Sequence, residues 1–138
     1  MNLSTLKTAL GVVTGTSIKE VLFDFYSVMN EDSTKTYPFA FWDVGAAEIE
    51  ENNAKVEATL QIPVYFAALF DYTSHDRMTK WQELKAQALV YFNKLNSVAG
   101  SKVYIDTRTM KLKLYEVANF SPDQDIAIMY TVTMKVYF

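Results

Sequence analysis

The sequence contains no cysteine, and only one of its 138 residues is a histidine. Disulfides, thiolate nucleophiles and cysteine-containing zinc sites are therefore excluded. The four glycines are scattered and form neither a P-loop nor a GxGxxG motif. No GxSxG turn of the α/β-hydrolases is present. Because no catalytic motif stands out, we expect neither enzymatic activity nor a bound cofactor.

Long apolar runs are also missing, whereas a bilayer-spanning helix needs about 20 such residues, so we expect no membrane segment. The start, MNLSTLKTALGVVTG, lacks the charged and apolar regions of a signal peptide. The chain has 13 Lys and Arg against 16 Asp and Glu, a net charge of −3. General nucleic-acid-binding proteins are usually basic, so this balance disfavours tight non-specific binding to DNA or RNA.

Hydrophobic residues, in contrast, make up half of the chain, and 14% of the residues are aromatic. This composition supports a sizeable core, and the length predicts one domain over residues 1–138. The strongest pattern is in Thr73–Asn96, which predicts a helix capped by Thr73 or Ser74. Its apolar residues recur every three or four positions and so share one face: Met78, Trp81, Leu84, Ala88, Tyr91, Phe92 and Leu95.

A shorter amphipathic helix is predicted over Asn2–Val13, with Asn2 or Ser4 as its cap and Gly15 beyond its end. Ser17–Met29 fits both a helix and a strand, and we interpret Val21–Val28 as a strand because it is rich in aromatic and β-branched residues.

The next segments read as strands and turns. A polar turn (30–35) precedes a strand over Tyr37–Val44, in which Pro38 belongs at the start or at an edge. Gly45–Asn53 is interpreted as an acidic loop. Ala54–Gln61 alternates apolar and polar residues, whereas Val64–Phe70 is apolar throughout. We predict one long strand, bent near Pro63, that runs from a half-exposed part into a buried part.

After the central helix we predict a short strand (103–105), a turn over Asp106–Thr109, a strand over Met110–Val117 and a loop (119–125). Ile126–Phe138 is the last strand, with apolar residues at every even position. The predicted fold class is α+β: a sheet that is mainly antiparallel or else mixed, with the long central helix and the short N-terminal helix packed on one face.

Two groups of residues have the composition of a chemical site. Asp71, His75 and Asp76 contain metal-ligating atoms, but the first turn of a helix also favours acidic residues. Asp24 and the acidic residues of the 45–53 loop could form a paired-carboxylate site, although clusters of charge usually face solvent. We favour the structural interpretation for both groups and predict no metal site.

Two further clusters suggest contacts with other molecules. Lys102, Arg108, Lys111 and Lys113 form a basic patch that could touch phosphates, or else the exposed face of a hairpin. The aromatic residues Tyr37, Phe39, Phe41 and Trp42 are expected to be partly core and partly a ligand wall or a subunit contact, because a short strand cannot bury both faces alone.

The order of elements resembles that of the tail terminator and head–tail joining (neck) proteins of tailed bacteriophages. The resemblance covers nearly the whole chain: a short helix, a strand, a Tyr37-Pro38 start to the next strand, a long strand ending at Asp71, a long helix (Arg77 to Leu95) and closing strands. Within these elements the matching motifs are Tyr37-Pro38 and the Asp71-to-helix transition.

The resemblance implies a non-catalytic structural protein of the virion. Its copies would form a ring of six or twelve, contact other neck, tail or portal proteins, and let DNA pass through the lumen without specific binding. As interface residues we predict Glu48, Ile49, Glu50, Glu51, Lys111, Lys113 and Lys135. Two alternatives stay open: a small adaptor or ligand-binding module with an apolar cleft between sheet and helix, and an enzyme with an unrecognised site.

Overall fold

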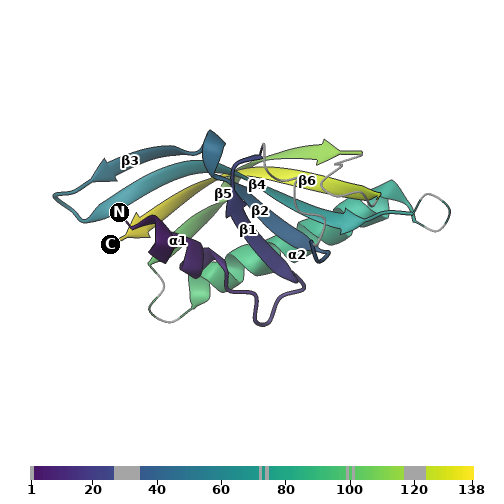
Figure 1. Ribbon diagram of the computed structural model, residues 1–138, viewed down its shortest axis with the longest axis horizontal. Helices are drawn as coiled ribbons and strands as arrows, with labels where there is room; N and C mark the ends of the chain where they lie inside the picture. Colours follow the sequence, from purple (N-terminus) through teal and green to yellow (C-terminus); the bar gives the residue numbers. More distant parts are fainter. Residues whose placement is uncertain are drawn as a thin grey trace.

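A computed structural model describes residues 2–26, 35–71, 73, 75–98, 100, 102–116 and 124–138. The described residues form a mixed six-stranded sheet and two α-helices, which confirms the predicted α+β class (Figure 1). The elements are α1 (Leu3–Leu10), β1 (Glu20–Asp24), β2 (Phe39–Asp43), the 3-10 turn η2 (Val44–Ala46), β3 (Glu48–Asn52), β4 (Glu57–Leu69), α2 (Arg77–Ser97), β5 (Val103–Tyr115) and β6 (Asp125–Tyr137).

The centre of the sheet is the antiparallel pair β4 and β6, in register from Glu57 opposite Tyr137 to Leu69 opposite Asp125. The strand order is β1-β2-β4-β6-β5, and β3 also pairs with β4. β2 and β3 therefore share one side of β4, each along a different half of it. Only β1 and β2 run parallel; the other pairs are antiparallel.

Pro63 marks the junction between the two halves of β4. β3 pairs with β4 as far as Gln61, and β2 begins its pairing at Val64. Proline has no N–H to donate, so it fits in the two-residue gap where the neighbouring strand changes. The long strand that we predicted is a single element, more exposed on one face before Pro63 and buried on both faces at 64–67, as predicted.

Both helices cover the same face of the sheet and share one core with it. From α2 this core contains Leu84, Ala88, Tyr91, Phe92 and Leu95, which confirms most of the predicted face. Met78 is wrongly placed in the prediction, because its side chain is 60% exposed. The even positions of β6 are buried from Ile126 to Val136, as their spacing predicts.

The start of α2 differs from the prediction. Asp76 is the N-cap: its carboxylate accepts hydrogen bonds from the backbone N–H of Thr79 at 3.1 Å and from the Thr79 hydroxyl at 3.0 Å. Thr73, which we predicted as a cap, instead donates to Asp71. The other predicted cap, Ser74, lies outside the described residues.

α1 begins at the predicted cap, since the Asn2 side chain accepts from the backbone N–H groups of Ser4 and Thr5. It ends earlier than predicted, at Leu10 with Gly11 as the C-cap. Its buried residues Leu6 and Leu10 belong to the core on α2.

Two predicted loops are strands or parts of strands. The 45–53 segment contains β3, because its residues pair with the first half of β4 and their acidic side chains all stay exposed. The predicted Asp106–Thr109 turn is an irregularity within β5, where the register against β6 shifts between Asp106 and Lys111. A bulge absorbs extra residues while both flanking parts stay paired with the same neighbour.

The remaining differences concern ends of elements. β1 ends at Asp24, earlier than the predicted Val28, and β2 spans 39–43 within the predicted 37–44. Most of the predicted turn over 30–35, and the predicted loop up to residue 123, lie outside the described residues.

A buried hydrogen-bond chain connects α1, α2 and β2. The Trp42 indole N–H donates to the Tyr91 hydroxyl at 3.0 Å, and that hydroxyl donates to the Leu10 backbone carbonyl. Trp42, Tyr91 and Leu10 are fully buried, so water cannot replace a missing partner.

Tyr91→Phe is therefore expected to lower the free energy of unfolding by about 2–3 kcal/mol, because it leaves the Trp42 N–H and the Leu10 carbonyl buried and unpaired. Urea denaturation followed by circular dichroism measures the change. Tyr104→Phe is the matched control: Tyr104 is 48% exposed, and its loss should change stability by less than about 0.5 kcal/mol. Equal effects of the two substitutions would contradict the role given to this chain.

Candidate functional site

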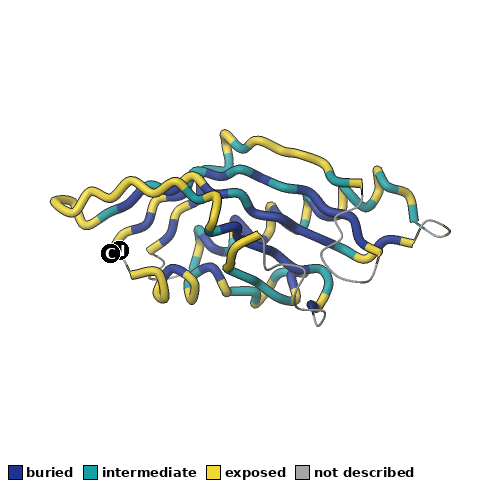
Figure 2. The backbone as a smooth tube through the Cα atoms, turned by 45° about the horizontal axis from the view of Figure 1, so that its top comes forward, coloured by how far each residue is buried: buried dark blue, intermediate teal, exposed yellow. Residues whose placement is uncertain are grey.

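The sheet face opposite the helices has a closed half and an open half. Figure 2 shows buried strands in the middle of the sheet and exposed stretches along its outer strands. The closed half is covered by a second apolar cluster, built from Phe39, Phe41, Tyr65, Ala67 and Ala127, with Leu22, Tyr37, Tyr115 and Met129 packed against it.

This cluster corrects the interpretation of the aromatic residues of 37–42 as partly a subunit contact. Trp42 lies in the core under the helices, and Phe39 and Phe41 are buried on the opposite face of the sheet. Tyr65 closes the cluster, with its ring 5.3 Å from that of Tyr26 and 5.7 Å from that of Tyr115. One protomer therefore buries these three strand residues without a partner.

The open half carries polar side chains in rows across four strands. One row runs from Glu48 through Gln61 and Thr133 to Asp106, and the next from Glu50 through Thr59 and Lys135 to Tyr104. Five of these eight side chains are exposed and the other three half-buried. We call this surface the open face.

β3 forms one free edge of the sheet, and all five of its residues are exposed. Glu48 and Glu50 lie on the open face, while Ile49, opposite Leu60, lies on the helix side and is 46% exposed. Glu51 also lies on the helix side, opposite Ala58. We call β3 the acidic edge; it brings together four of the predicted interface residues.

β5 forms the opposite free edge. Lys111 and Lys113 lie on the sheet face opposite the helices, beside Thr131 and Met129, and both are exposed. Lys113 borders the closed half, since its ammonium lies 5.2 Å from the centre of the Tyr115 ring. Leu112 and Leu114 point to the helix side but remain 39% and 44% exposed, because they lie at the margin of the sheet. We call Lys111–Leu114 the basic edge.

The ends of β5 are held by side chains of α2. The Asn96 side chain binds both backbone groups of Ile105: it accepts from the N–H at 2.7 Å and donates to the carbonyl at 2.9 Å. The Trp81 indole donates to the Tyr115 carbonyl at 3.3 Å. The basic edge lies between these two attachments.

The predicted basic patch is divided in the structure. Arg108 lies in the irregular part of β5 and pairs with Asp106, with 3.1 Å between Nε and Oδ1. Hydrogen bonds from the Arg108 guanidinium and backbone N–H hold the pKa of the Asp106 carboxyl below its ordinary value. Lys102 lies at the other end of the strand, so the basic edge owes its charge to Lys111 and Lys113. Lys135, on β6 in the middle of the open face, belongs to neither edge.

The residues of the candidate metal site serve local structure. The His75 Nδ1 accepts a hydrogen bond from the Asp71 backbone N–H at 2.9 Å, and Asp76 caps α2. The Asp71 carboxylate accepts from both the backbone and the hydroxyl of Thr73. Among the described residues, no three His, Cys, Asp or Glu side chains lie where they could hold a metal ion.

The candidate paired carboxylates are also distributed over separate strands. Asp24 ends β1, opposite Asp43 of β2, and its carboxylate accepts from the Phe25 N–H at 2.8 Å. Glu48, Glu50 and Glu51 lie on β3, which pairs with β4 instead.

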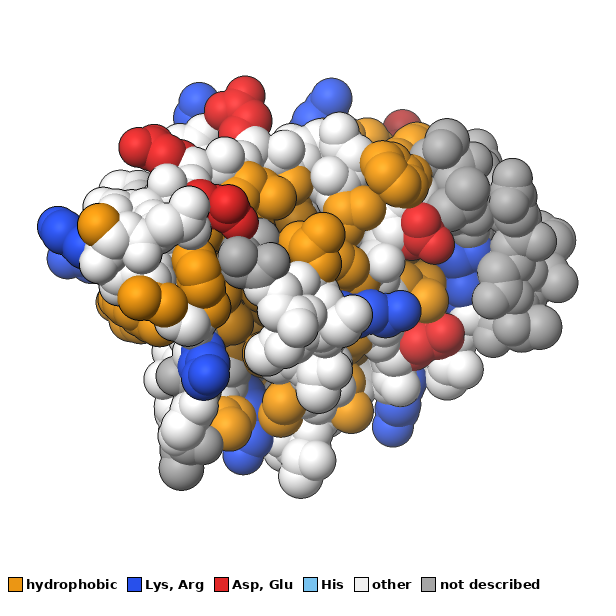
Figure 3. Space-filling view, turned by 60° about the vertical axis from the view of Figure 1, so that its left-hand side comes forward, with side chains coloured by type: hydrophobic (Ala, Val, Ile, Leu, Met, Phe, Trp, Pro, Cys, Tyr) orange, Lys and Arg blue, Asp and Glu red, His pale blue; other side chains and the backbone are white. Residues whose placement is uncertain are grey.

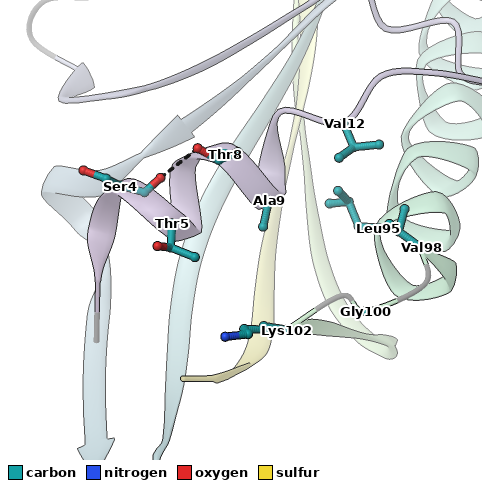
Figure 4. Close-up of a pocket in the computed structure, with 9 residues that line it drawn as sticks. All are labelled: Ser4, Thr5, Thr8, Ala9, Val12, Leu95, Val98, Gly100 and Lys102. Carbon is teal, nitrogen blue, oxygen red and sulfur yellow. Dashed lines mark hydrogen bonds between the residues drawn. The ribbon is translucent and has the colours of Figure 1, made fainter.

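One hollow of about 490 Å³ lies between α1 and the end of α2 (Figure 4). Ala9, Val12, Leu95 and Val98 supply its apolar wall. Its polar groups are the Lys102 ammonium and three hydroxyls of α1, of which the Thr8 hydroxyl donates to the Ser4 carbonyl at 3.0 Å. A smaller hollow of about 240 Å³ shares Thr5, Ala9 and Lys102 with it.

The hollows lie toward the end of the molecule that carries both termini. Figure 3 brings this end forward and shows apolar side chains exposed across its middle, with charged ones around them. No described helix is long and apolar enough to cross a membrane.

No protein-family model matches the chain, and no curated protein is similar enough to count as a relative. Arguments about function therefore depend on the edges, the open face and the hollow.

Sequence reasoning identified the charged residues of both edges but missed two features. The first is the exposure of Leu112 and Leu114, since KLKL at a sheet margin leaves both sides of the strand accessible. The second is the role of Asn96, which lies at the end of the predicted helix. No local pattern indicates its contact with Ile105, which depends on how α2 crosses β5.

Asn96→Ala should lower the free energy of unfolding by about 1–2 kcal/mol, because two backbone groups of Ile105 lose their partner. Asn93→Ala on the same helix is the control, since Asn93 is exposed. Thermal and urea denaturation of the two variants measure the difference. The attachment of β5 to α2 is wrong if both substitutions are equally mild.

Alkaline pH should destabilise the protein. Burial raises the pKa of the Tyr91 hydroxyl, and burial together with Tyr115 raises that of Tyr65. An unfolded tyrosine ionises near pH 10, so the unfolded chain loses these protons first. The stability that the neutral hydroxyls contribute is complete below about pH 10 and declines as pH rises further. Urea denaturation at a series of pH values should show this decline, with a smaller slope in Tyr91→Phe; an unchanged slope would contradict it.

Proposed function

We propose that this protein is a non-catalytic structural component of a bacteriophage virion that assembles edge to edge into a closed ring in the neck or tail. The observation that carries the proposal is the separation of charge between β3 and β5, two edge strands on opposite sides of one sheet. The acidic edge presents Glu48 and Glu50, and the basic edge presents Lys111 and Lys113. Within the described part of the chain, none of the four takes part in an ion pair.

Edges of opposite charge favour head-to-tail contacts between copies over symmetric contacts. Contact between two copies of the acidic edge, or of the basic edge, brings like charges together and is unfavourable. Contact between an acidic and a basic edge is favourable, and such a heterologous contact produces a ring when its rotation closes. The resemblance in element order supports a ring of six or twelve copies.

The composition of the open face fits a surface that lines the lumen of the ring and lets DNA pass without specific binding. Its rows combine carboxylates, hydroxyls and Lys135 instead of a continuous basic surface. A mixed surface on a net acidic chain attracts phosphates weakly, so DNA passes without being held. The remaining surfaces would contact other neck, tail or portal proteins.

A second candidate is a ligand-binding module, and the hollow beside α1 is the observation that favours it. A volume of about 490 Å³ lies within the range of small-molecule sites, and Lys102 with the α1 hydroxyls could orient an anionic, partly apolar ligand. The two proposals use different surfaces, so both can be tested in one protein.

The ring predicts an oligomer of defined size. Native mass spectrometry and negative-stain electron microscopy of the purified protein should show rings of six or twelve copies. Because edge charges contribute to the contact, salt near 1 M, where the screening length falls to about 3 Å, should shift the population toward smaller species. A monomer at every concentration, together with absence from purified virions, would refute the proposal.

A further inference from the structure

We propose that β3 of one copy adds as an antiparallel strand to the basic edge of β5 in a second copy, so that the sheet continues from one protomer to the next. The inference rests on the proposed function, because it specifies the contact that builds the ring. The paired residues are Glu48 with Lys113, Ile49 with Leu112, and Glu50 with Lys111.

The charged residues of the two edges match in their spacing along the strand and in the face of the sheet on which they lie. On each edge two like charges are two residues apart and flank one apolar residue. Successive side chains of a strand point to opposite faces, so on each edge both charges lie on the face opposite the helices and the apolar residue lies on the helix side. The register confirms this placement, since Ile49 and Leu112 lie opposite the core residues Leu60 and Tyr130.

The direction of the strands follows from the sheet. β3 is antiparallel to β4, β4 to β6, and β6 to β5, so β3 and β5 run in opposite directions within one protomer. A second copy that extends the sheet with its open face on the same side keeps these directions. β3 therefore meets the neighbouring β5 in antiparallel orientation.

The backbone of β5 offers this contact only along part of its outer edge. Asn96 already binds both backbone groups of Ile105, so this part of the edge is occupied. Lys111–Leu114 lies farther along the strand and is exposed. An exposed strand edge is a suitable site for strand addition.

The charges of the neighbouring residues also favour the register in which Glu48 pairs with Lys113. If a neighbour continued the existing rows without an offset, Glu48 would meet Asp106, an acidic residue already paired with Arg108. Placing Glu48 opposite Lys113 moves the contact along β6 from Thr133 to Met129, about 14 Å at 3.4 Å per residue. A constant offset between neighbouring strands is also what a closed, tilted sheet requires.

The apolar pair strengthens the contact on the helix side. Ile49 is 46% exposed and Leu112 is 39% exposed in the protomer. Side by side across the two strands, each side chain removes part of the other from water, and this burial stabilises the contact at salt concentrations that screen the charges. The pairing thus uses both faces of both edges.

Charge reversal tests the pairing. Glu48→Lys/Glu50→Lys gives a protomer with two basic edges, and Lys111→Glu/Lys113→Glu gives one with two acidic edges. Each variant alone should need at least about tenfold higher concentration to assemble than the wild type. An equimolar mixture should assemble like the wild type, because each basic edge then meets an acidic one. The variant with all four substitutions should also assemble alone.

The outcomes separate the pairing from the proposed function. A wild-type protein that never assembles overturns both. Rings of the wild type that persist unchanged in each double variant overturn the pairing and leave the ring intact. Circular dichroism of the variants verifies that they fold, which is expected because all four residues are exposed.

Cross-linking tests the register without changing charge. The chain has no cysteine, so a single substitution introduces the only thiol. Under mild oxidation, a mixture of Ile49→Cys and Leu112→Cys proteins should give a disulfide-linked dimer, and neither protein alone should do so. Val56→Cys mixed with Leu112→Cys is the control, because Val56 is equally exposed, at 47%, but outside the pairing. Equal dimer yields from the two mixtures would overturn the register.

Discussion

The continuous pairing of β4 with β6 is the constraint on which the rest of the structure depends. Thirteen residues of each strand remain in register; β2, β3 and β5 pair with one of the two, and β1 joins the sheet through β2. Alternation along this pair assigns each residue to the helix side or to the open face. One face therefore receives α1 and α2, and the outer strands β3 and β5 form edges with different side chains.

This arrangement explains why the closed and open halves of the sheet differ in their side chains. The Trp42–Tyr91–Leu10 chain and the second aromatic cluster close the sheet on both sides of β2. Among the described residues, the half formed by β3 and the adjoining strands has no such cover on its open face. The charged residues of both edges are exposed, so the edges can carry opposite charges without weakening the core.

Periodicity in the sequence was sufficient to predict the buried faces of the elements that have one buried side. The three-and-four spacing of α2 and the even positions of β6 predicted their faces, because each has one continuous apolar neighbour. β3 was missed because EIEEN buries nothing and pairs only through its backbone. The bulge in β5 and the contact of Asn96 with Ile105 depend on tertiary geometry, which single-strand patterns do not encode. The charged residues of both edges were identified, but their placement on opposite edges needed the strand order.

The central claim is that the backbone edges of β3 and β5 become paired when copies meet. Hydrogen–deuterium exchange measures this pairing directly, because a backbone N–H in a strand ladder exchanges slowly. On assembly, the account predicts slower exchange in Glu48–Asn52 and Lys111–Leu114, with little change at Ile105, which Asn96 already binds. Assembled protein whose two edges exchange as fast as those of the dilute protomer would contradict it.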